Sequence, residues 1–306
     1  MSKPLPPPAS SQSYFDVSVL SAGFITLVET LFIKDGNPDI KNVCPSMSFL
    51  LRHSLSKKTI LFDLGIRKDW RNYPPQVVGT IDAIFPLEIP LDVVDSLRLG
   101  GLEPNDINYA IPSHVHWDHV GNPDLFPKTQ FIAGEGGKEV LRNGSSRSSE
   151  DPLYNTAYFF SDTLPTDRTT YLDDITWKEV GPFPRAYDFF GDGSIYIIDA
   201  PGHLPGHINI LARTSAEGSW IYLGGDSAGD VRLLTGEKEI GFYTNPITGY
   251  TGCMHQDLDA ALETIRRMRV VSEDSKVLVL IAHDHVWFNE NKDKGVLFPG
   301  KIPPKV

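Results

Sequence analysis

The sequence predicts a layered α/β (α+β) fold, in which short buried strands alternate loosely with amphipathic helices. Short apolar runs bounded by Ser, Gly or Asp are typical of strands. Two other stretches carry apolar residues at helical spacing. Hydrophobic residues make up 41% of the 306 residues and charged residues 22%, which favours a globular protein with a buried core. We therefore expect layers of sheet and helix.

The strands are predicted from apolar runs that end at turn-forming residues. Because each run is short and lacks helical periodicity, a strand fits better than a helix. The predicted strands are residues 15–20, 47–51, 59–62, 107–111, 194–198, 220–223 and 276–281.

The helices are predicted from spacing and from their ends. Residues 91–99 place apolar side chains at helical intervals and stop at Gly100, a residue suited to a helix C-terminus. Residues 258–270 place Leu258, Leu262, Ile265 and Met268 on one predicted face.

The predicted domain organisation is a flexible tail and one domain. Residues 1–12 are rich in Pro and Ser, which is typical of a flexible segment. Residues 13–306 form the predicted domain. Within it, residues 143–192 are polar and interrupted by prolines, so we expect an inserted segment that acts as a lid.

Charge and composition narrow the classes of partner and the location. The formal net charge of −11 opposes extensive contact with nucleic acid, because such contact needs clustered Lys and Arg. The sequence has neither a long apolar run nor an apolar leader, so we expect no membrane contact and a cytoplasmic protein. Cys44 and Cys253 stand far apart, which predicts two reduced, buried thiols. The partner expected is a small-molecule substrate, and a homodimer is compatible with the sequence.

The stretch HVHWDH, residues 114–119, concentrates metal-ligating side chains. Residues two apart in an extended segment project to one side, so His114 and His116 can bind one ion. Asp118 and His119 follow where a helix is expected, and can bind a neighbouring ion. Three further stretches, PGHLPGH, GGDS and AHDH, each follow an apolar strand, and loops at strand ends can bring distant ligands together. Nitrogen and carboxylate ligands favour two Zn²⁺ ions, with iron or manganese as alternatives.

In this order and at these separations, the four motifs resemble those of the metallo-β-lactamase superfamily. The stretch GLEPNDINYAIPSHVHWDHVGN, with LFDLG upstream, is similar to the N-acyl-homoserine lactone lactonases, the quorum-quenching branch. The resemblance implies a four-layer αββα sandwich of two mixed sheets flanked by helices. It also implies one zinc on His114, His116 and His207, a second on Asp118, His119 and His283, and Asp226 bridging both ions together with a hydroxide.

The resemblance further implies a hydrolase that opens a small cyclic ester or amide, a lactonase or lactamase. The hydroxide would attack the carbonyl, and Asp118 would carry its proton to the leaving group. The lactonases carry a tyrosine three positions after the bridging aspartate, where this sequence has Gly229. We therefore predict that Tyr243 or Tyr250 replaces it or that the substrate differs. An ordinary structural role is the alternative for these tyrosines.

Three other polar residues have predicted roles at or beside the metal ligands. His203 is predicted to be structural or to contact a ligand, because the resemblance implies that the second histidine of PGHLPGH is the ligand; metal binding by His203 is the alternative. His285 is the alternative to His283 as a metal ligand. Asp63 is predicted either to orient a ligand imidazole or to cap a turn.

The same ligands leave other functions open. A thioester hydrolase of the glyoxalase II type would use the same set, and a mononuclear-iron sulfur dioxygenase is a further alternative. A flavodiiron-type centre is disfavoured, because those relatives carry glutamate where this sequence has His116. A non-catalytic binding protein is opposed because all the predicted ligands are present.

Overall fold

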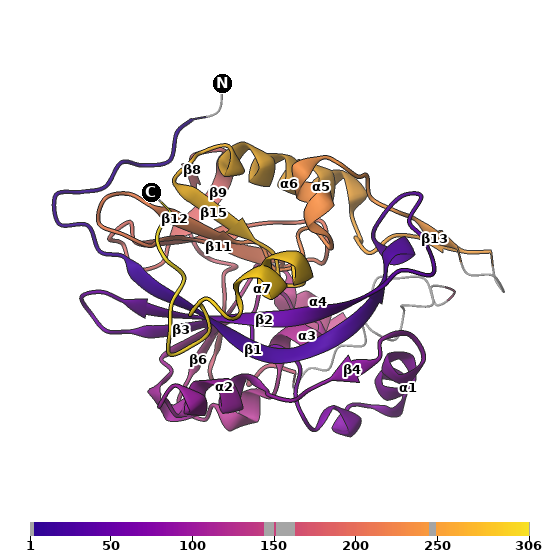
Figure 1. The fold of residues 1–306 in the computed structure, drawn as a ribbon. Coiled ribbons are helices and arrows are strands. Elements are labelled where there is room, and N and C mark those ends of the chain that lie inside the picture. Colours follow the sequence, from indigo (N-terminus) through magenta and orange to yellow (C-terminus); the bar gives the residue numbers. More distant parts are fainter. Residues whose placement is uncertain (1–2, 144–149, 151–162, 245–248, 306) are drawn as a thin grey trace.

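The computed structural model describes residues 3–143, 150, 163–244 and 249–305. Two sheets face each other, and helices cover their outer faces. Figure 1 shows α5 and α6 over the sheet that contains β12 and β15, whereas α2 lies below β1 and β2 on the opposite side of the molecule. This arrangement confirms the predicted αββα sandwich.

The first sheet is mixed and is built from the N-terminal half of the chain. Its strand order is β4-β1-β2-β3-β5-β6-β7. β1 and β2 pair antiparallel along most of their length, whereas β3, β5, β6 and β7 run parallel. The strands are β1 (Phe15–Val28), β2 (Lys41–His53), β3 (Thr59–Phe62), β4 (Leu87–Glu88), β5 (Tyr109–Ile111), β6 (Gln130–Ala133) and β7 (Thr169–Tyr171).

The second sheet is built from the C-terminal half. Its strand order is β15-β12-β11-β10-β9-β8, antiparallel except for the pair β12 and β15. A separate hairpin joins β13 to β14. The strands are β8 (Lys178–Val180), β9 (Phe183–Asp188), β10 (Ile195–Asp199), β11 (Ile208–Arg213), β12 (Trp220–Leu223), β13 (Tyr243–Thr244), β14 (Thr251–Gly252) and β15 (Val277–Leu280).

The helices occupy the connections between strands. A helix or 3-10 turn follows several strand ends, as expected where short loops connect packed layers. The α-helices are α1 (Pro75–Ile84), α2 (Val93–Leu99), α3 (Trp117–Val120), α4 (Gly137–Asn143), α5 (Val231–Thr235), α6 (Leu258–Ser272) and α7 (His285–Asn291). The 3-10 helices are η1 (Glu29–Leu31), η2 (Trp70–Asn72), η3 (Pro104–Asp106) and η4 (Pro123–Leu125).

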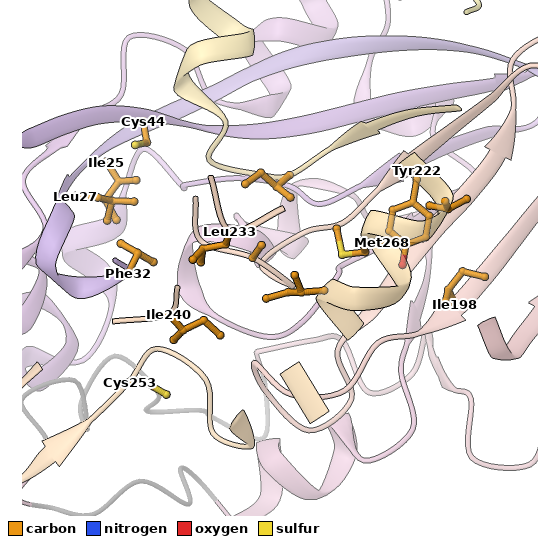
Figure 2. Close-up of a cluster of buried hydrophobic side chains, with 14 of the residues drawn as sticks. Ile25, Leu27, Phe32, Cys44, Ile198, Tyr222, Leu233, Ile240, Cys253 and Met268 are labelled. Atoms are coloured by element: carbon orange, nitrogen blue, oxygen red, sulfur yellow. The ribbon is translucent and has the colours of Figure 1, made fainter. Parts of the chain in front are cut away.

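Both faces of the central strands are buried, so each sheet contributes to two apolar layers. In β2, Phe49 and Leu51 pack between the sheets, whereas Leu50 packs with the residues of α2. On the other outer face, Tyr222 of β12 packs with Met268 of α6 (Figure 2). Alternation of side chains along a strand explains why these runs are apolar at every position.

The predicted elements are present, but one predicted face is different. The structure confirms strands at 59–62 and 220–223 with the same bounds, and helices at 93–99 and 258–272. In α6, Ile265 and Met268 are buried, whereas Leu262 is exposed. The buried face runs through Ala261 and Val271 as well, so Leu262 lies at the exposed edge of the predicted face.

The described part of residues 143–192 forms strands. β7 forms one edge of the first sheet, and β8 and β9 lie at one edge of the second, so these strands belong to the two sheets. A lid elsewhere in the segment stays a prediction. Pro184 is tolerated because it lies outside the paired residues of β9 and β10. Residues 144–149 and 151–162 lie outside the described residues.

The N-terminal segment contacts the body of the protein. The buried guanidinium of Arg213 donates to the carbonyl oxygens of Pro6 and Pro7 at 2.8 and 3.0 Å. Lys3 forms an ion pair with Glu179. Flexibility of residues 1–12 stays a prediction. Across the described chain, no helix has the length and apolar character needed to span a bilayer.

Candidate metal centre

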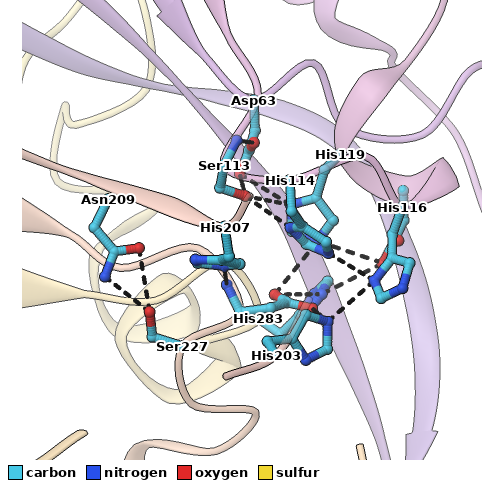
Figure 3. Close-up of polar contacts among 12 residues, drawn as sticks. Asp63, Ser113, His114, His116, His119, His203, His207, Asn209, Ser227 and His283 are labelled. Atoms are coloured by element: carbon cyan, nitrogen blue, oxygen red, sulfur yellow. Dashed lines mark hydrogen bonds and ion pairs between the residues drawn. The ribbon is translucent and has the colours of Figure 1, made fainter. Parts of the chain in front are cut away.

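The polar residues of the centre follow strands of both sheets. His114 and His116 lie between β5 and α3, and Asp118 and His119 lie within α3 itself. The other side chains come from the second sheet: His203 from the β10–β11 connection, Asp226 after β12 and His283 after β15. Figure 3 shows the histidines of this set converging from separate loops. The rigid sheets therefore place ligands from distant parts of the sequence at one site.

One group of possible ligands contains His114, His116, His203 and Asp226, all of them buried. Nε2 of His114 lies 2.6 Å from Nδ1 of His116, and Nε2 of His203 lies 3.0 Å from the same nitrogen. One oxygen of Asp226 lies 3.6 Å from Nε2 of His203. Three nitrogens and one oxygen thus face a common point, which is the donor set of a tetrahedral metal site.

A second group contains Asp118, His119 and His283, also buried. Oδ2 of Asp118 lies 3.4 Å from Nε2 of His283 and 3.7 Å from Nε2 of His119. Oδ1 of Asp226 lies 3.3 Å from Nε2 of both histidines. The two oxygens of Asp226 therefore face different groups, as a bridging carboxylate would.

Hydrogen bonds behind the imidazoles fix which nitrogen points into the centre. Nδ1 of His119 donates to Oδ2 of Asp63 at 2.9 Å, and Nδ1 of His283 donates to the Pro45 carbonyl at 2.9 Å. Ser113 Oγ lies 3.0 Å from Nδ1 of His114, and its own backbone N–H donates to Oδ1 of Asp63 at 2.6 Å. Such partners hold the ring orientation and leave Nε2 for the metal. Asp63 thus contacts a candidate ligand directly, as the first of its two predicted roles requires.

The histidine pKa values shift in opposite directions in the two groups. Burial, together with the neighbouring imidazoles, holds the pKa of His114 well below its usual value, and burial does the same for His203. Burial would also lower the pKa of His119 and His283, but Asp226 and the other carboxylates raise both well above the usual value. The carboxylates therefore favour positive charge beside them, while His114 and His203 stay neutral and able to ligate.

The residues fit divalent cations. Nε2 of His119 and Oδ1 of Asp226 are buried atoms without a hydrogen bond in the described structure. Buried polar atoms are normally satisfied, so two that point into one centre call for a partner such as a metal. Nε2 of His114 also lies 2.6 Å from Nδ1 of His116, a separation that a proton or a shared metal ion would bridge. Metal ions would satisfy both conditions.

Gly225 permits the close approach of Asp226 to this centre. Its φ of +48° lies in the left-handed region, and a Cβ there would overlap Ser113. A glycine is therefore required just before Asp226 by both conformation and space. This explains the GGDS sequence in physical terms.

The two histidines of PGHLPGH differ in their contacts. His203 belongs to the first ligand group, whereas His207 belongs to neither. Nε2 of His207 accepts from the backbone N–H of Asp226 at 3.1 Å, so this nitrogen is already engaged. Burial lowers the pKa of His207 to about 3, which keeps it a neutral acceptor. His207 as a ligand stays a prediction, and His203 is a further candidate ligand for the first group.

A pocket opens beside the second group. Its polar lining is His116, Asp118, Asp226 and His283, and its apolar lining is Ile25, Leu27, Phe32, Phe85, Trp117 and Met254. Neither Tyr243 nor Tyr250 lines it. The Tyr243 hydroxyl instead donates to the Cys253 carbonyl at 3.4 Å. A catalytic role for either tyrosine stays a prediction without support from the pocket. His285 lies outside both groups, with Nδ1 3.7 Å from Sγ of Cys44.

Ser113 and Phe32 were not predicted from the sequence. Ser113 directly precedes HVHWDH, and a hydroxyl beside a ligand motif is the signal that could have identified it. Phe32 gives no such signal, because only the fold places it against the position of Gly229.

Two facing sheets with a His/Asp centre between their loops define a metallo-β-lactamase fold. A family model described as the metallo-beta-lactamase superfamily matches residues 42–215. The chain therefore belongs to this superfamily. An N-acyl homoserine lactone hydrolase with N-hexanoyl-L-homoserine bound at its catalytic metal centre has a similar structure, with a TM-score of 0.68. The similarity covers 94% of this chain and 99% of that chain at 20% identity, and it shows the fold.

Two named relatives are similar in sequence. Cytochrome P450 monooxygenase mpaDE' of Penicillium brevicompactum is 31% identical across 97% of this chain, but this chain spans only 36% of that protein's length. Gamma-lactamase FDB1 of Fusarium pseudograminearum is 34% identical across 73% of this chain and 56% of its own length. Relatives named for lactam and lactone hydrolysis support the predicted class, a metal-dependent hydrolase.

Proposed function

We propose that this chain is a metal-dependent hydrolase that opens a small cyclic ester or amide. The observation that carries the proposal is the pair of buried ligand groups that share Asp226. Two Zn²⁺ ions suit these nitrogen and carboxylate donors, with iron or manganese as alternatives. Relatives named as a gamma-lactamase and a homoserine lactone hydrolase support the reaction class.

The proposed first site consists of His114 and His116 with His207, or with His203, which the geometry groups with them. The second consists of Asp118, His119 and His283, with Asp226 shared. When bound, the metals would lower the pKa of water to about 7 and polarise the substrate carbonyl. Asp63 and Ser113 hold the ligand imidazoles in orientation from behind.

Asp118 is proposed to move the proton. Its Oδ2 faces Nε2 of His283 and its carboxylate also lines the pocket, so it contacts both the centre and the substrate space. Burial opposes the ionised form, but His119 and His283 lower the pKa of Asp118 below its usual value. The carboxylate is therefore ionised at neutral pH, can accept the proton from the attacking water and can return it to the leaving oxygen or nitrogen.

The pocket walls favour a substrate with apolar surface. Ile25 and Leu27 of β1 face Phe85 and Met254 across the space beside the centre. Apolar walls exclude water and strengthen the electrostatic interactions of the reacting groups. The reacting carbonyl would lie toward Asp226, and the remainder of the substrate would contact the apolar walls.

The test is a substrate screen on purified protein with elemental analysis of its metals. We expect turnover of lactones or lactams, about two metal equivalents, loss of turnover with a chelator and recovery on adding Zn²⁺. Asp118→Ala should remove turnover while the protein stays folded. Turnover that survives chelation would contradict the proposal. Turnover of thioesters alone would favour the thioester hydrolase, and one iron per chain would favour the sulfur dioxygenase.

The location and the assembly of the protein are predicted from the sequence alone. A cytoplasmic location and a homodimer stay predictions, and size-exclusion chromatography with light scattering would test the second.

A further inference from the structure

Phe32 lies between the metal-centre pocket and Gly229. Its side chain is only 8% exposed and lines the same pocket as Asp118 and Asp226. A Cβ at position 229 would overlap the ring of Phe32. The ring thus occupies the space that a side chain at position 229 would fill, three residues after Asp226.

The backbone around Phe32 is held firmly. The Phe32 carbonyl accepts from the N–H of Gly241 at 2.8 Å. One turn earlier, the carboxylate of Glu29 pairs with Arg232 at 2.7 Å and accepts from the N–H of Asn37 at 2.7 Å. Arg232 belongs to α5, which begins just after Gly229. These contacts hold η1 against α5 and so fix the backbone that carries the ring of Phe32.

The walls near Phe32 are apolar as well. Figure 2 shows Phe32 close to Ile25 and Leu27, both of which line the pocket. An aromatic ring in this position offers no hydrogen-bond donor to a carbonyl group. It can therefore discriminate between substrates by size and shape, but not by hydrogen bonding.

We propose that Phe32 sets the size limit for the substituent of the substrate beside Asp118 and Asp226. Gly229 is the residue that leaves room for the ring. The inference rests on the proposed hydrolysis of a cyclic ester or amide and adds the side chain that selects among such substrates.

The first experiment measures kcat/KM for a series of γ-lactones with alkyl substituents of increasing length. Replacing Phe32 with a smaller side chain should raise the ratio of long-chain to short-chain kcat/KM. We expect at least a tenfold rise for Phe32→Ala and a smaller rise for Phe32→Leu, since a single methylene in a pocket alters selectivity by about 10-fold or more. Phe126→Leu is the matched control, because Phe126 is fully buried and belongs to a different cluster. Its ratio should equal that of the wild type.

The second experiment tests the pairing of Phe32 with Gly229. Gly229→Ala should displace the ring into the pocket and lower kcat/KM at least tenfold for every lactone. The double variant Phe32→Ala with Gly229→Ala should recover most of this loss, because the added methyl then meets no ring. Gly79→Ala is the control, since a Cβ there meets open space.

Metal content and thermal unfolding are measured for every variant. Metal content equal to the wild type, with a changed length preference, supports the inference. A wild type that turns over no lactone or lactam contradicts the proposed function itself. An active wild type whose length preference is the same in Phe32→Ala, or a double variant no better than Gly229→Ala, overturns the role of Phe32.

Discussion

Oδ2 of Asp63 lies 2.9 Å from Nδ1 of His119, joining the end of β3 to the start of the metal centre across 56 positions of sequence. The same carboxylate accepts from the backbone N–H and the hydroxyl of Ser113. One buried aspartate therefore orients His119 directly and fixes the residue that contacts His114.

Asp63→Asn should weaken metal binding without unfolding the protein. Asp63 has a positive φ of 60°, which asparagine tolerates well. The neutral amide orients His119 less strongly, so we expect about 10- to 100-fold weaker binding of zinc. Competition with a chromophoric chelator measures the affinity. Asp173→Asn, at an exposed position, is the control. Unchanged affinity in Asp63→Asn would show that this hydrogen bond does not support the centre.

His203→Ala and His207→Gln should differ in metal content. His203 belongs to the first ligand group, so its loss should lower zinc from two equivalents toward one. His207 instead accepts from the N–H of Asp226, so His207→Gln should retain both metals. Elemental analysis after gel filtration distinguishes the two. Loss of metal only in the His207 variant would show that His207 is the ligand, as the sequence predicts.

Arg213→Met should destabilise the fold and release the N-terminal segment. The Arg213 guanidinium lies over the ring of Trp220 at 3.9 Å and donates to the carbonyl oxygens of Pro6 and Pro7. Hydrogen bonds from a charged group contribute more than neutral ones, so the free energy of unfolding should fall by about 3 kcal/mol. Urea denaturation measures it, and limited proteolysis reports on residues 3–12. Arg71→Met, which removes an exposed ion pair with Asp82, should cost less than about 1 kcal/mol.

Cys44 should stay unreactive until strongly alkaline pH. Burial raises the pKa of its thiol from 9.0 to about 11. Because the thiolate is the nucleophile, alkylation by iodoacetamide should be slow at pH 8 and rise toward pH 11. The folded state binds the proton more tightly than the unfolded state, so this group lowers stability as pH rises from about 9 through 11.

The measurement uses a Cys253→Ser variant, so that alkylation reports on Cys44 alone. The same variant unfolded in guanidinium should react with a midpoint near pH 9. Equal reaction rates in the folded and unfolded protein at pH 8 would show that the thiol is accessible.

Much of the fold follows from local patterns in the sequence. The bounds of β3 and β12 were predictable because each is an apolar run between turn residues. Pro182 and Pro184 concealed β9, since proline opposes a strand and only the pairing pattern shows that it is tolerated here. The exposure of Leu262 depends on where α6 meets the second sheet, which spacing alone does not reveal.

The segments that form the candidate centre were predictable from the sequence, but the choice between neighbouring histidines was not. HVHWDH identified the region because its ligands are close in sequence. His203 and His207 follow the same dipeptide, Pro-Gly, so only the tertiary structure shows which imidazole faces His116. Phe32 is distant in sequence from every ligand, and its role depends on the packing of η1 against Gly229.

The centre draws its side chains from both sheets, with His114 to His119 supplied by the N-terminal half and His203, Asp226 and His283 by the C-terminal half. Cations held there would join the halves of the molecule as a cross-link does. Neither sheet could then separate from the other without ejecting them. Bound cations would therefore stabilise the folded molecule, because unfolding that separates the sheets also releases them.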